Sequence, residues 1–402
     1  MKRLNPRRYR LPVVVKLILS AGVVACGTAS PDSSTTSTGV PASTGDTSPE
    51  PPGSEDPGSA DEVPVAPPGV EESPTETVAD LPLQTPVEAM PPAAAGGAPA
   101  TETPEPEAPV LSELPKFVGN ITTGNSVDTN GLVYSDYWDQ ITPENAGKWG
   151  SVQATAASAP NYAALDAIYD YTQRKGIIFK EHTFLWGPQQ PSGDITPADV
   201  QSWMQGFCDR YPNTRLIDVV NEPPPHQEPR YANAIGGGTN GNWQWIVNAF
   251  TWARQACPNA TLILNDYNNI EFANQNQHFI DIVKAIQAQG APIDAVGAQS
   301  HGLSGANSTR TMIPLLTKLH DDTGLPVYIT EYDINQADDA AQLARFQEHF
   351  TFFLDTEWVR GVTVWGWILG RTWVANSGLV RNGEPRPAMV WLMQQLGRSA
   401  PQ

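Results

Sequence analysis

The chain has 402 residues and a formal net charge of −19, with 43 Asp or Glu against 24 Lys or Arg. This length can hold one (β/α)8 barrel with appendages, or two smaller domains. The acidic balance argues against nucleic-acid binding, because phosphate backbones are held by basic surfaces. The composition also changes sharply along the chain, which indicates segments of different kinds.

Residues 1–25 have the features of a targeting segment. Six Lys or Arg lie between Lys2 and Lys16, and a short apolar stretch follows at 17–25. This stretch is too short to span a bilayer, so we interpret residues 1–25 as a signal peptide. The residues VVAC at 23–26 resemble a bacterial lipobox, which favours a lipid on Cys26. An ordinary secretory cleavage site is the alternative.

The next segment has the composition of a linker. Residues 27–113 are rich in Pro, Ser, Thr, Gly, Ala and Glu, and hold 16 Asp or Glu but no Lys or Arg. Such a stretch cannot bury enough apolar surface to offset chain entropy. We therefore expect residues 26–113 to form a disordered, acidic, Pro/Ser/Thr/Glu-rich linker. From residue 114 onward, 18 Lys or Arg stand against 27 Asp or Glu, a balance that suits a neutral polysaccharide substrate.

Residues 114–402 alternate between short apolar runs and amphipathic stretches. The apolar runs are typical of buried parallel strands and lie at 117–121, 138–142, 177–182, 215–221, 261–265, 293–298, 326–331 and 361–366. Helical periodicity occupies 162–175, 197–209, 242–256, 272–288, 309–322 and 341–356. Strands separated by helices in this way predict an α/β fold, a single (β/α)8 TIM barrel.

Two of the apolar runs end in a glutamate, Glu222 after LIDVVN and Glu331 after PVYIT. In a (β/α)8 barrel the residue at the carboxyl end of a strand faces the active site, so both side chains are expected there. Glycosidic cleavage needs such a pair, because one carboxyl group protonates the leaving oxygen while the other attacks or activates water. Structural roles as caps or salt-bridge partners are the alternative.

The residues around this pair resemble those of glycoside hydrolase family 10, the endo-1,4-β-xylanases. The matching segments follow the family order: TPENAGKW at 142–149, HTFLWGPQ at 182–189, DVVNEP at 218–223, LNDYN at 264–268, GAQSH at 297–301, ITEYD at 329–333 and VTVWG at 362–366. The resemblance implies a retaining endo-1,4-β-xylanase that hydrolyses internal bonds of xylan. Glu331 would be its nucleophile and Glu222 its acid/base. No metal or cofactor is expected, since no metal-ligand spacing or dinucleotide fingerprint occurs.

The resemblance also implies a set of substrate-binding residues. Those that match family positions on the non-reducing side of the substrate are Glu144, Asn145, Lys148, His182, Trp186 and Gln189. The other expected members of the set are Asn221, Gln299, His301, Trp365 and Trp373. Asn221 can bind the sugar 2-hydroxyl, and His301 can keep Glu331 ionised. Core packing is the alternative for His182 and the tryptophans.

Two aspartates flank the catalytic pair and could be mistaken for it. Asp218 lies two residues before Glu222, on the same face of the strand, and is expected to support the barrel interior. Asp333 lies two residues after Glu331 and is expected to tune the site.

The chain departs from the common family pattern after Gln189 and again in the eighth-strand loop, which reads WILGRTW at 367–373. The second departure leaves the substrate preference and the role of Arg371 open. Two alternatives therefore accompany the xylanase hypothesis. One is a retaining β-glycosidase acting on another β-1,4-glucoside or plant glycoside, and the other is a non-catalytic surface carbohydrate-binding lipoprotein.

Cys208 and Cys257 stand in matching contexts, each at the end of a helical stretch and ahead of a strand. In an oxidising compartment this favours a disulfide, with two buried free thiols as the alternative. The protein is expected to be a monomer that is exported, either as a cell-surface or outer-membrane lipoprotein or in secreted form. Its expected partners are xylan and xylo-oligosaccharides, with a membrane reached only through lipid on Cys26.

Overall fold

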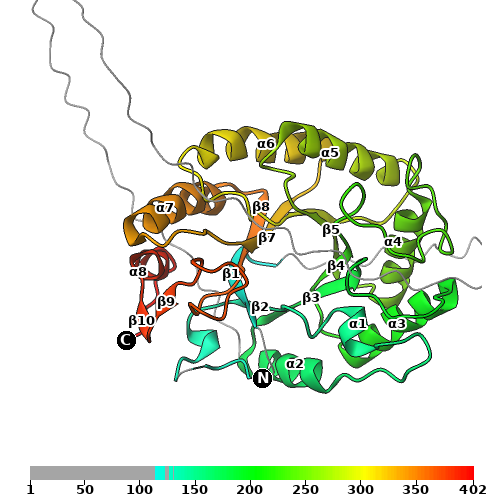
Figure 1. The fold of residues 1–402 in the computed structure, drawn as a ribbon, viewed down its shortest axis with the longest axis horizontal. Coiled ribbons are helices and arrows are strands. Elements are labelled where there is room, and N and C mark those ends of the chain that lie inside the picture. Colours follow the sequence, from blue (N-terminus) through cyan, green and yellow to red (C-terminus); the bar gives the residue numbers. More distant parts are fainter. Residues whose placement is uncertain (1–113, 123–125, 130) are drawn as a thin grey trace, which may run out of the picture. The chain divides into compact units, whose positions relative to one another are not determined.

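A closed barrel of eight parallel strands lies at the centre of the computed structural model, which describes residues 114–122, 126–129 and 131–402 (Figure 1). The strands are β1 Phe117–Thr122, β2 Gln140–Pro143, β3 Ile178–Leu185, β4 Leu216–Asn221, β5 Thr261–Asp266, β6 Ala295–Ala298, β7 Val327–Tyr332 and β8 Val359–Val364. Strand β1 pairs with both β2 and β8, which closes the sheet. The predicted (β/α)8 fold is confirmed. The predicted signal peptide, the linker and Cys26 lie outside the described residues.

Helices surround the strands (Figure 1). They are α1 Trp149–Val152, α2 Ala163–Lys175, α3 Pro197–Arg210, α4 Gln244–Ala256, α5 Ala273–Gln287, α6 Ser308–Thr323, α7 Asp339–Asp355 and α8 Pro387–Gln395. Every helix expected from the sequence is present, within three residues at either end. In the part of the chain that the structure describes, no helix combines the length and the apolar character needed to cross a membrane.

The sequence did not predict α1, α8 or two short elements, the 3-10 turn Tyr134–Asp136 and the hairpin of β9 Val380–Arg381 and β10 Glu384–Pro385. Helix α1 has four residues, too few to show a period. Helix α8 begins with Pro387 and continues as an almost unbroken apolar run, so its helical period is hidden.

The barrel interior is apolar at one end and charged at the other. At the amino ends of the strands, Phe117, Leu216, Ile263, Ala295 and Tyr328 form a small buried cluster of their own. Towards the carboxyl ends the buried side chains include Lys180, His182, Asp218 and Glu331. A larger hydrophobic core fills the space between the strands and the helices. The apolar end closes the barrel, and the charged end opens to the loops that follow the strands.

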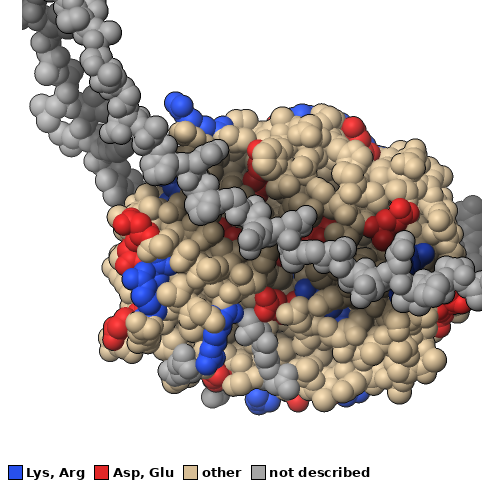
Figure 2. Space-filling view, in the orientation of Figure 1, with Lys and Arg blue, Asp and Glu red and all other residues tan. Residues whose placement is uncertain are grey.

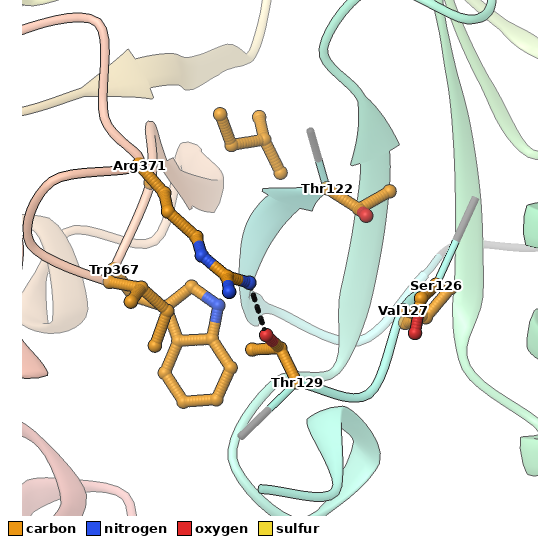
Figure 3. A pocket seen from close by; sticks show the side chains of 9 residues that line it. Thr122, Ser126, Val127, Thr129, Trp367 and Arg371 are labelled. Atoms are coloured by element: carbon orange, nitrogen blue, oxygen red, sulfur yellow. Dashed lines mark hydrogen bonds between the residues drawn. The ribbon is translucent and has the colours of Figure 1, made fainter. Parts of the chain in front are cut away.

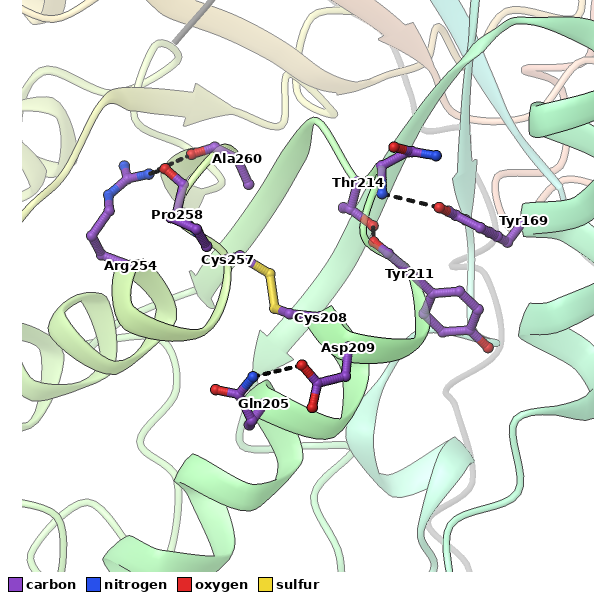
Figure 4. Close-up of a disulfide and its surroundings, with 11 residues drawn as sticks. Tyr169, Gln205, Cys208, Asp209, Tyr211, Thr214, Arg254, Cys257, Pro258 and Ala260 are labelled. Carbon is purple, nitrogen blue, oxygen red and sulfur yellow. Dashed lines mark hydrogen bonds between the residues drawn. A yellow bond between two sulfur atoms is a disulfide. The ribbon is translucent and has the colours of Figure 1, made fainter. Parts of the chain in front are cut away.

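A disulfide joins Cys208, near the end of α3, to Cys257, which follows α4 (Figure 4). The two Cα atoms lie 5.5 Å apart, and the bridge closes a loop with a sequence separation of 49 residues. The predicted pairing is confirmed. The bridge restricts the unfolded chain. Because it links neighbouring helices on the outside of the barrel, it does not touch the strand ends.

Replacing both cysteines with alanine should lower the free energy of unfolding by about 2–4 kcal/mol, because a loop of this size gains entropy in the unfolded state. Denaturant unfolding of the wild type, with and without reductant, measures the effect. The double variant should be insensitive to reductant. Equal stability of the variant and the oxidised wild type would contradict a stabilising role for the bridge.

Candidate active site

Side chains from most strands meet at the carboxyl end of the barrel. Glu222 directly follows β4 with a positive φ of 53°, and Glu331 lies near the end of β7. Asn265 in β5 connects the two strands, since its Nδ2 donates to Asn221 Oδ1 at 2.8 Å and to Glu331 Oε1 at 2.8 Å. Acidic and basic side chains lie together in a hollow near the middle of the face seen in Figure 2.

Cationic groups and an amide surround the Glu331 carboxylate. His301 Nε2 lies 3.4 Å from Oε2, and His182 Nδ1 lies 4.0 Å from Oε1. Burial alone would raise the pKa of Glu331. The charge of His182, the hydrogen bond and charge of His301, and the charge of Lys180 outweigh burial and lower the pKa to about 2. Glu331 is therefore ionised at neutral pH, as a nucleophile must be.

His301 owes its charge to two carboxylates. Its Nδ1 contacts Asp333 Oδ2 at 2.9 Å, and its other ring nitrogen faces Glu331. Burial disfavours the charged ring, but the hydrogen bonds to Asp333 and Glu331 raise the pKa of His301 to about 10. Asp333 thus acts on Glu331 through His301, in agreement with its expected role beside the catalytic pair.

Neutral donors hold the Glu222 carboxyl group. Trp186 Nε1 donates to Oε2 at 2.7 Å, and Gln299 Nε2 donates to Oε1 at 3.0 Å. The Glu222 backbone N–H donates to the Asn265 carbonyl at 2.8 Å, which fixes the turn that follows β4. Glu222 is partly exposed, whereas Glu331 is buried. The two glutamates therefore meet the substrate in different electrostatic settings.

Asp218 lies one layer deeper and contacts two basic side chains. Its Oδ2 is 2.7 Å from Lys180 Nζ and 2.9 Å from His182 Nδ1, and all three side chains are buried. Because β3 pairs with β4 in register Lys180↔Leu216 and His182↔Asp218, the alternating side chains point into the barrel together. The expectation that Asp218 supports the interior agrees with this arrangement. Lys180 was not singled out from the sequence.

The loop after β2 brings Glu144, Asn145 and Lys148 to the same end of the barrel. Lys148 Nζ donates to Asn145 Oδ1 at 3.0 Å and lies 4.5 Å from the centre of the Trp186 ring. Burial lowers the pKa of Lys148, against the opposing charges of Glu331, Glu144 and Glu222. Burial raises the pKa of Glu144, against the charges of Lys148 and His182. Because Glu144 and Lys148 each alter the pKa of the other, and both are influenced by Glu331, these groups belong to one polar site.

Of the remaining predicted residues, Asn221, Trp365 and Trp373 contact the side chains described above. Asn221 Oδ1 accepts from Asn265 and, at 3.3 Å, from Gln299 Nε2, while Gln189 has a buried Oε1 without a hydrogen-bond partner. The Trp365 ring packs edge-on against His182, with 5.2 Å between the ring centres. Trp373 Nε1 donates to Asp333 Oδ2 at 3.0 Å, although 60% of the Trp373 side chain is exposed.

A pair of stacked aromatic rings, which was not predicted from the sequence, lies near Glu222. The rings of His226 and Tyr267 stack with centres 3.8 Å apart. His226 Nδ1 contacts Asp266 Oδ1 at 2.7 Å, and its Nε2 contacts Gln275 Oε1 at 2.7 Å. Tyr267 and Asp266 belong to the LNDYN segment quoted above. That segment was the only indication in the sequence analysis that these two residues lie at the site. His226 lies in a proline-rich turn without periodicity, so its stacking partner could not be predicted from the sequence.

Comparison with known proteins agrees with this geometry. The family model described as glycosyl hydrolase family 10 matches residues 114–395. Endo-1,4-beta-xylanase B of Cellvibrio japonicus is 45% identical over 286 residues, which cover 69% of this chain and 45% of that protein. Endo-1,4-beta-xylanase C of Phanerodontia chrysosporium is 30% identical over 292 residues, covering 66% of this chain and 72% of that protein. The chain thus spans less than half the length of the Cellvibrio relative.

Solved structures share the fold. Xylanase 10B from Thermotoga petrophila, crystallised with xylobiose, superposes with a TM-score of 0.62 at 22% identity, covering 70% of this chain and 94% of that chain. Since the family model spans the barrel from its first strand to its last helix, the chain belongs to glycosyl hydrolase family 10.

Proposed function

We propose that the barrel is a retaining endo-1,4-β-xylanase, which hydrolyses internal β-1,4-xylosidic bonds of xylan. The observation that carries the proposal is the contrast between two strand-end glutamates, one held by cations and the other by neutral donors. Family membership and the xylanase names of the relatives support the substrate class.

In the first step, Glu331 attacks the anomeric carbon while Glu222 gives its proton to the leaving glycosidic oxygen. His301 and Asn265 keep the Glu331 carboxylate oriented. A covalent glycosyl-enzyme results, and the reducing-side fragment departs. In the second step, Glu222 takes a proton from water, and that water releases the sugar from Glu331 with net retention. Trp186 and Gln299 hold Glu222 in one orientation for both transfers.

Asn221 is placed to bind the 2-hydroxyl of the reacting sugar. Its Oδ1 already accepts from Asn265 and Gln299, so its own NH₂ group remains to donate to a hydroxyl oxygen. A hydrogen bond to the 2-hydroxyl strengthens in the oxocarbenium-like transition state. The orientation of Asn221 therefore contributes to the rate as well as to binding.

The two sides of the bond meet different surfaces. On the non-reducing side, Glu144, Asn145 and Lys148 offer charged and amide groups to sugar hydroxyls. On the leaving side, the partly exposed Tyr267, stacked on His226, offers a ring on which a pyranose can stack. Xylan provides both hydroxyls to bridge and faces to stack. The alternative of another β-glycoside rests on the altered eighth-strand loop, and assays on xylan, cellulose and aryl xylosides side by side distinguish the two.

Substitutions of the two glutamates should have different consequences. Glu331→Ala should abolish turnover on every substrate. Glu222→Ala should lower kcat on xylan by about 10²–10⁴-fold, but far less for bond cleavage in an aryl xylobioside, because an activated leaving group needs little protonation. Steady-state and burst kinetics on both substrates measure this.

Glu357→Ala, on the exposed turn after α7, serves as the control and should remain fully active. Xylan hydrolysis at the wild-type rate in either active-site variant would remove that glutamate from its role. Proton NMR of the first product should show the β-anomer. An initial α-anomer would overturn the retaining mechanism.

His301→Gln should shift the acid limb of the pH profile to higher pH. The nucleophile must be ionised, and its depressed pKa keeps it so until the pH falls towards about 2. Without the His301 cation, the pKa of Glu331 moves up towards the ordinary value. At pH 4, kcat/KM should then fall about 3–10-fold further than at pH 7, each measured relative to wild type. His320→Gln, a ring stacked on Trp358 outside the site, is the matched control. An equal loss at every pH would mean that His301 shapes the site without setting this charge.

We also propose that residues 1–25 direct export and that Cys26 carries lipid, with residues 26–113 as the tether. Expressed in a bacterial host, the wild-type chain should incorporate labelled fatty acid and sediment with membranes, whereas Cys26→Ser should do neither. Unlabelled, soluble wild-type protein would favour simple secretion instead.

A further inference from the structure

We propose that Glu181 is a positioning residue, whose protonated carboxyl group lies buried in the barrel wall and supports the loop of residues 144–148 after β2. Glu181 lies in the middle of β3 and is fully buried. The two-step mechanism described above makes no use of it. Its role at the loop rests on the xylanase function proposed above, whereas the protonation of its carboxyl group does not depend on that function.

The Glu181 side chain points away from the barrel interior. Strand β3 pairs with β4 in the register Glu181↔Ile217, between the pairs that hold Lys180 and His182. Since side chains alternate along a strand, Glu181 faces outward where its two neighbours face the interior. Its paired residue Ile217 belongs to the larger hydrophobic core between the strands and the helices. The carboxyl group therefore lies in this apolar layer and not at the charged end of the barrel.

In the part of the chain that the structure describes, neither oxygen of the Glu181 carboxyl group has a hydrogen-bond partner. Two charged groups act on it from the strands, Asp218 with the same sign and Lys180 with the opposite sign. The Lys180 Nζ is already paired with Asp218, at 2.7 Å. Among the helices, Tyr162 at the N-cap of α2 lies close enough to be influenced by Glu181. A carboxylate buried in this way without a partner is costly, so the group keeps its proton.

The protonated state makes the stability of the fold depend on pH. Burial and the charge of Asp218 raise the pKa of Glu181 well above its usual range, against the His182 backbone N–H and the charge of Lys180. In the unfolded chain an ordinary glutamate ionises above about pH 4.3. Between that pH and the pKa in the folded state, the folded chain holds one proton more than the unfolded chain. The stability contributed by Glu181 is therefore lost as the pH rises through this range.

The loop of residues 144–148 meets the carboxyl group through Gly147. A Cβ at Gly147 would lie 2.5 Å from Glu181 Oε2 and 2.9 Å from Oε1, so a side chain has no room while Glu181 is in place. Gly147 precedes Lys148, whose Nζ donates to Asn145 Oδ1 at 3.0 Å. The same Nζ lies 4.5 Å from the centre of the Trp186 ring, which donates to the proposed acid/base. A displacement of Gly147 would therefore reach groups that are expected to hold the sugar.

The first test detects the proton on Glu181. Denaturant unfolding of the full-length wild type and Glu181→Gln, between about pH 5.5 and 7.5, compares their unfolding equilibrium constants. Glutamine keeps the shape but cannot ionise, so the variant should gain on the wild type by about tenfold per pH unit. Glu181→Met, which fills the same space, should show the same slope even if its stability differs at every pH. Glu357→Gln, on the exposed turn after α7, is the matched control and should show no such slope.

Infrared spectroscopy detects the same proton without unfolding the protein. The difference spectrum between the wild type and Glu181→Gln at about pH 7 should contain the carbonyl stretch of one protonated carboxyl group. A carboxylate band in its place, or a stability difference that does not change with pH, would overturn the proposal. Either result would mean that Glu181 is ionised in the folded barrel.

The second test measures the support of the loop. Gly147→Ala should raise the KM for xylohexaose about tenfold, with a smaller change in kcat, because the new Cβ meets the carboxyl group and displaces the loop. The φ of Gly147 is not left-handed, so only the lack of space opposes an alanine. Glu181→Ala removes the opposing group, so the double variant should have a lower KM than additive effects predict. Gly241→Ala, where a Cβ would meet nothing within 4 Å, is the control.

The outcomes separate this inference from the proposed function. Additive effects of Gly147→Ala and Glu181→Ala on KM would refute the support of the loop by Glu181. A chain that shows the pH-dependent stability difference but hydrolyses no xylan would refute the proposed activity and leave the protonated carboxyl group established. The same pair of substitutions, measured by calorimetric binding of xylohexaose, would then decide the role of Glu181 at the loop.

Discussion

The catalytic end of the barrel depends on one buried ion pair, between Lys180 of β3 and Asp218 of β4. Asp218 also contacts His182, and the electrostatic effects of His182 and Lys180 contribute to the lowered pKa of Glu331. Removing one partner of such a buried pair typically costs about 3–5 kcal/mol, because the other charge is left uncompensated. The basic side chains that lower the pKa of Glu331, the proposed nucleophile, therefore depend on Asp218 for a counter-charge in the interior. Asp218 thus links the stability of the barrel to the role proposed for Glu331.

The same frame gives two identical side chains different surroundings. Glu331 is enclosed by histidines and an asparagine, whereas Glu222 emerges from a strained turn into contact with Trp186 and Gln299. Electrostatic preorganisation of this kind acts without reorganising the protein during the reaction. Asn265 connects the halves, since one amide group binds both Asn221 and Glu331. The division of labour thus follows from which strand each glutamate occupies.

The barrel and many residues of the candidate site could be predicted from the sequence. An apolar run indicates each strand, and the polar residue that follows the run indicates a side chain at the carboxyl end of the barrel. It could not predict Lys180 as a member of the site. A lysine within a strand normally faces solvent, and here its partner Asp218 is 38 residues further along the chain and becomes adjacent only through β3–β4 pairing. The stack of His226 on Tyr267 was missed for a similar reason. Its members come from loops after different strands, where no period exists and only the closed barrel determines proximity.

The loop after β8 is tied to the residues that surround Glu331. Its inner part is constrained, because Trp365 packs on His182 and Trp373 binds Asp333, so changes there would reach Glu331 through the histidines. Between these anchors, the Arg371 guanidinium donates to Thr129 on the segment after β1 (Figure 3). The segment 367–373, where the chain departs from the common family pattern, therefore lies directly after a tryptophan that packs on His182 and ends in a tryptophan that binds Asp333.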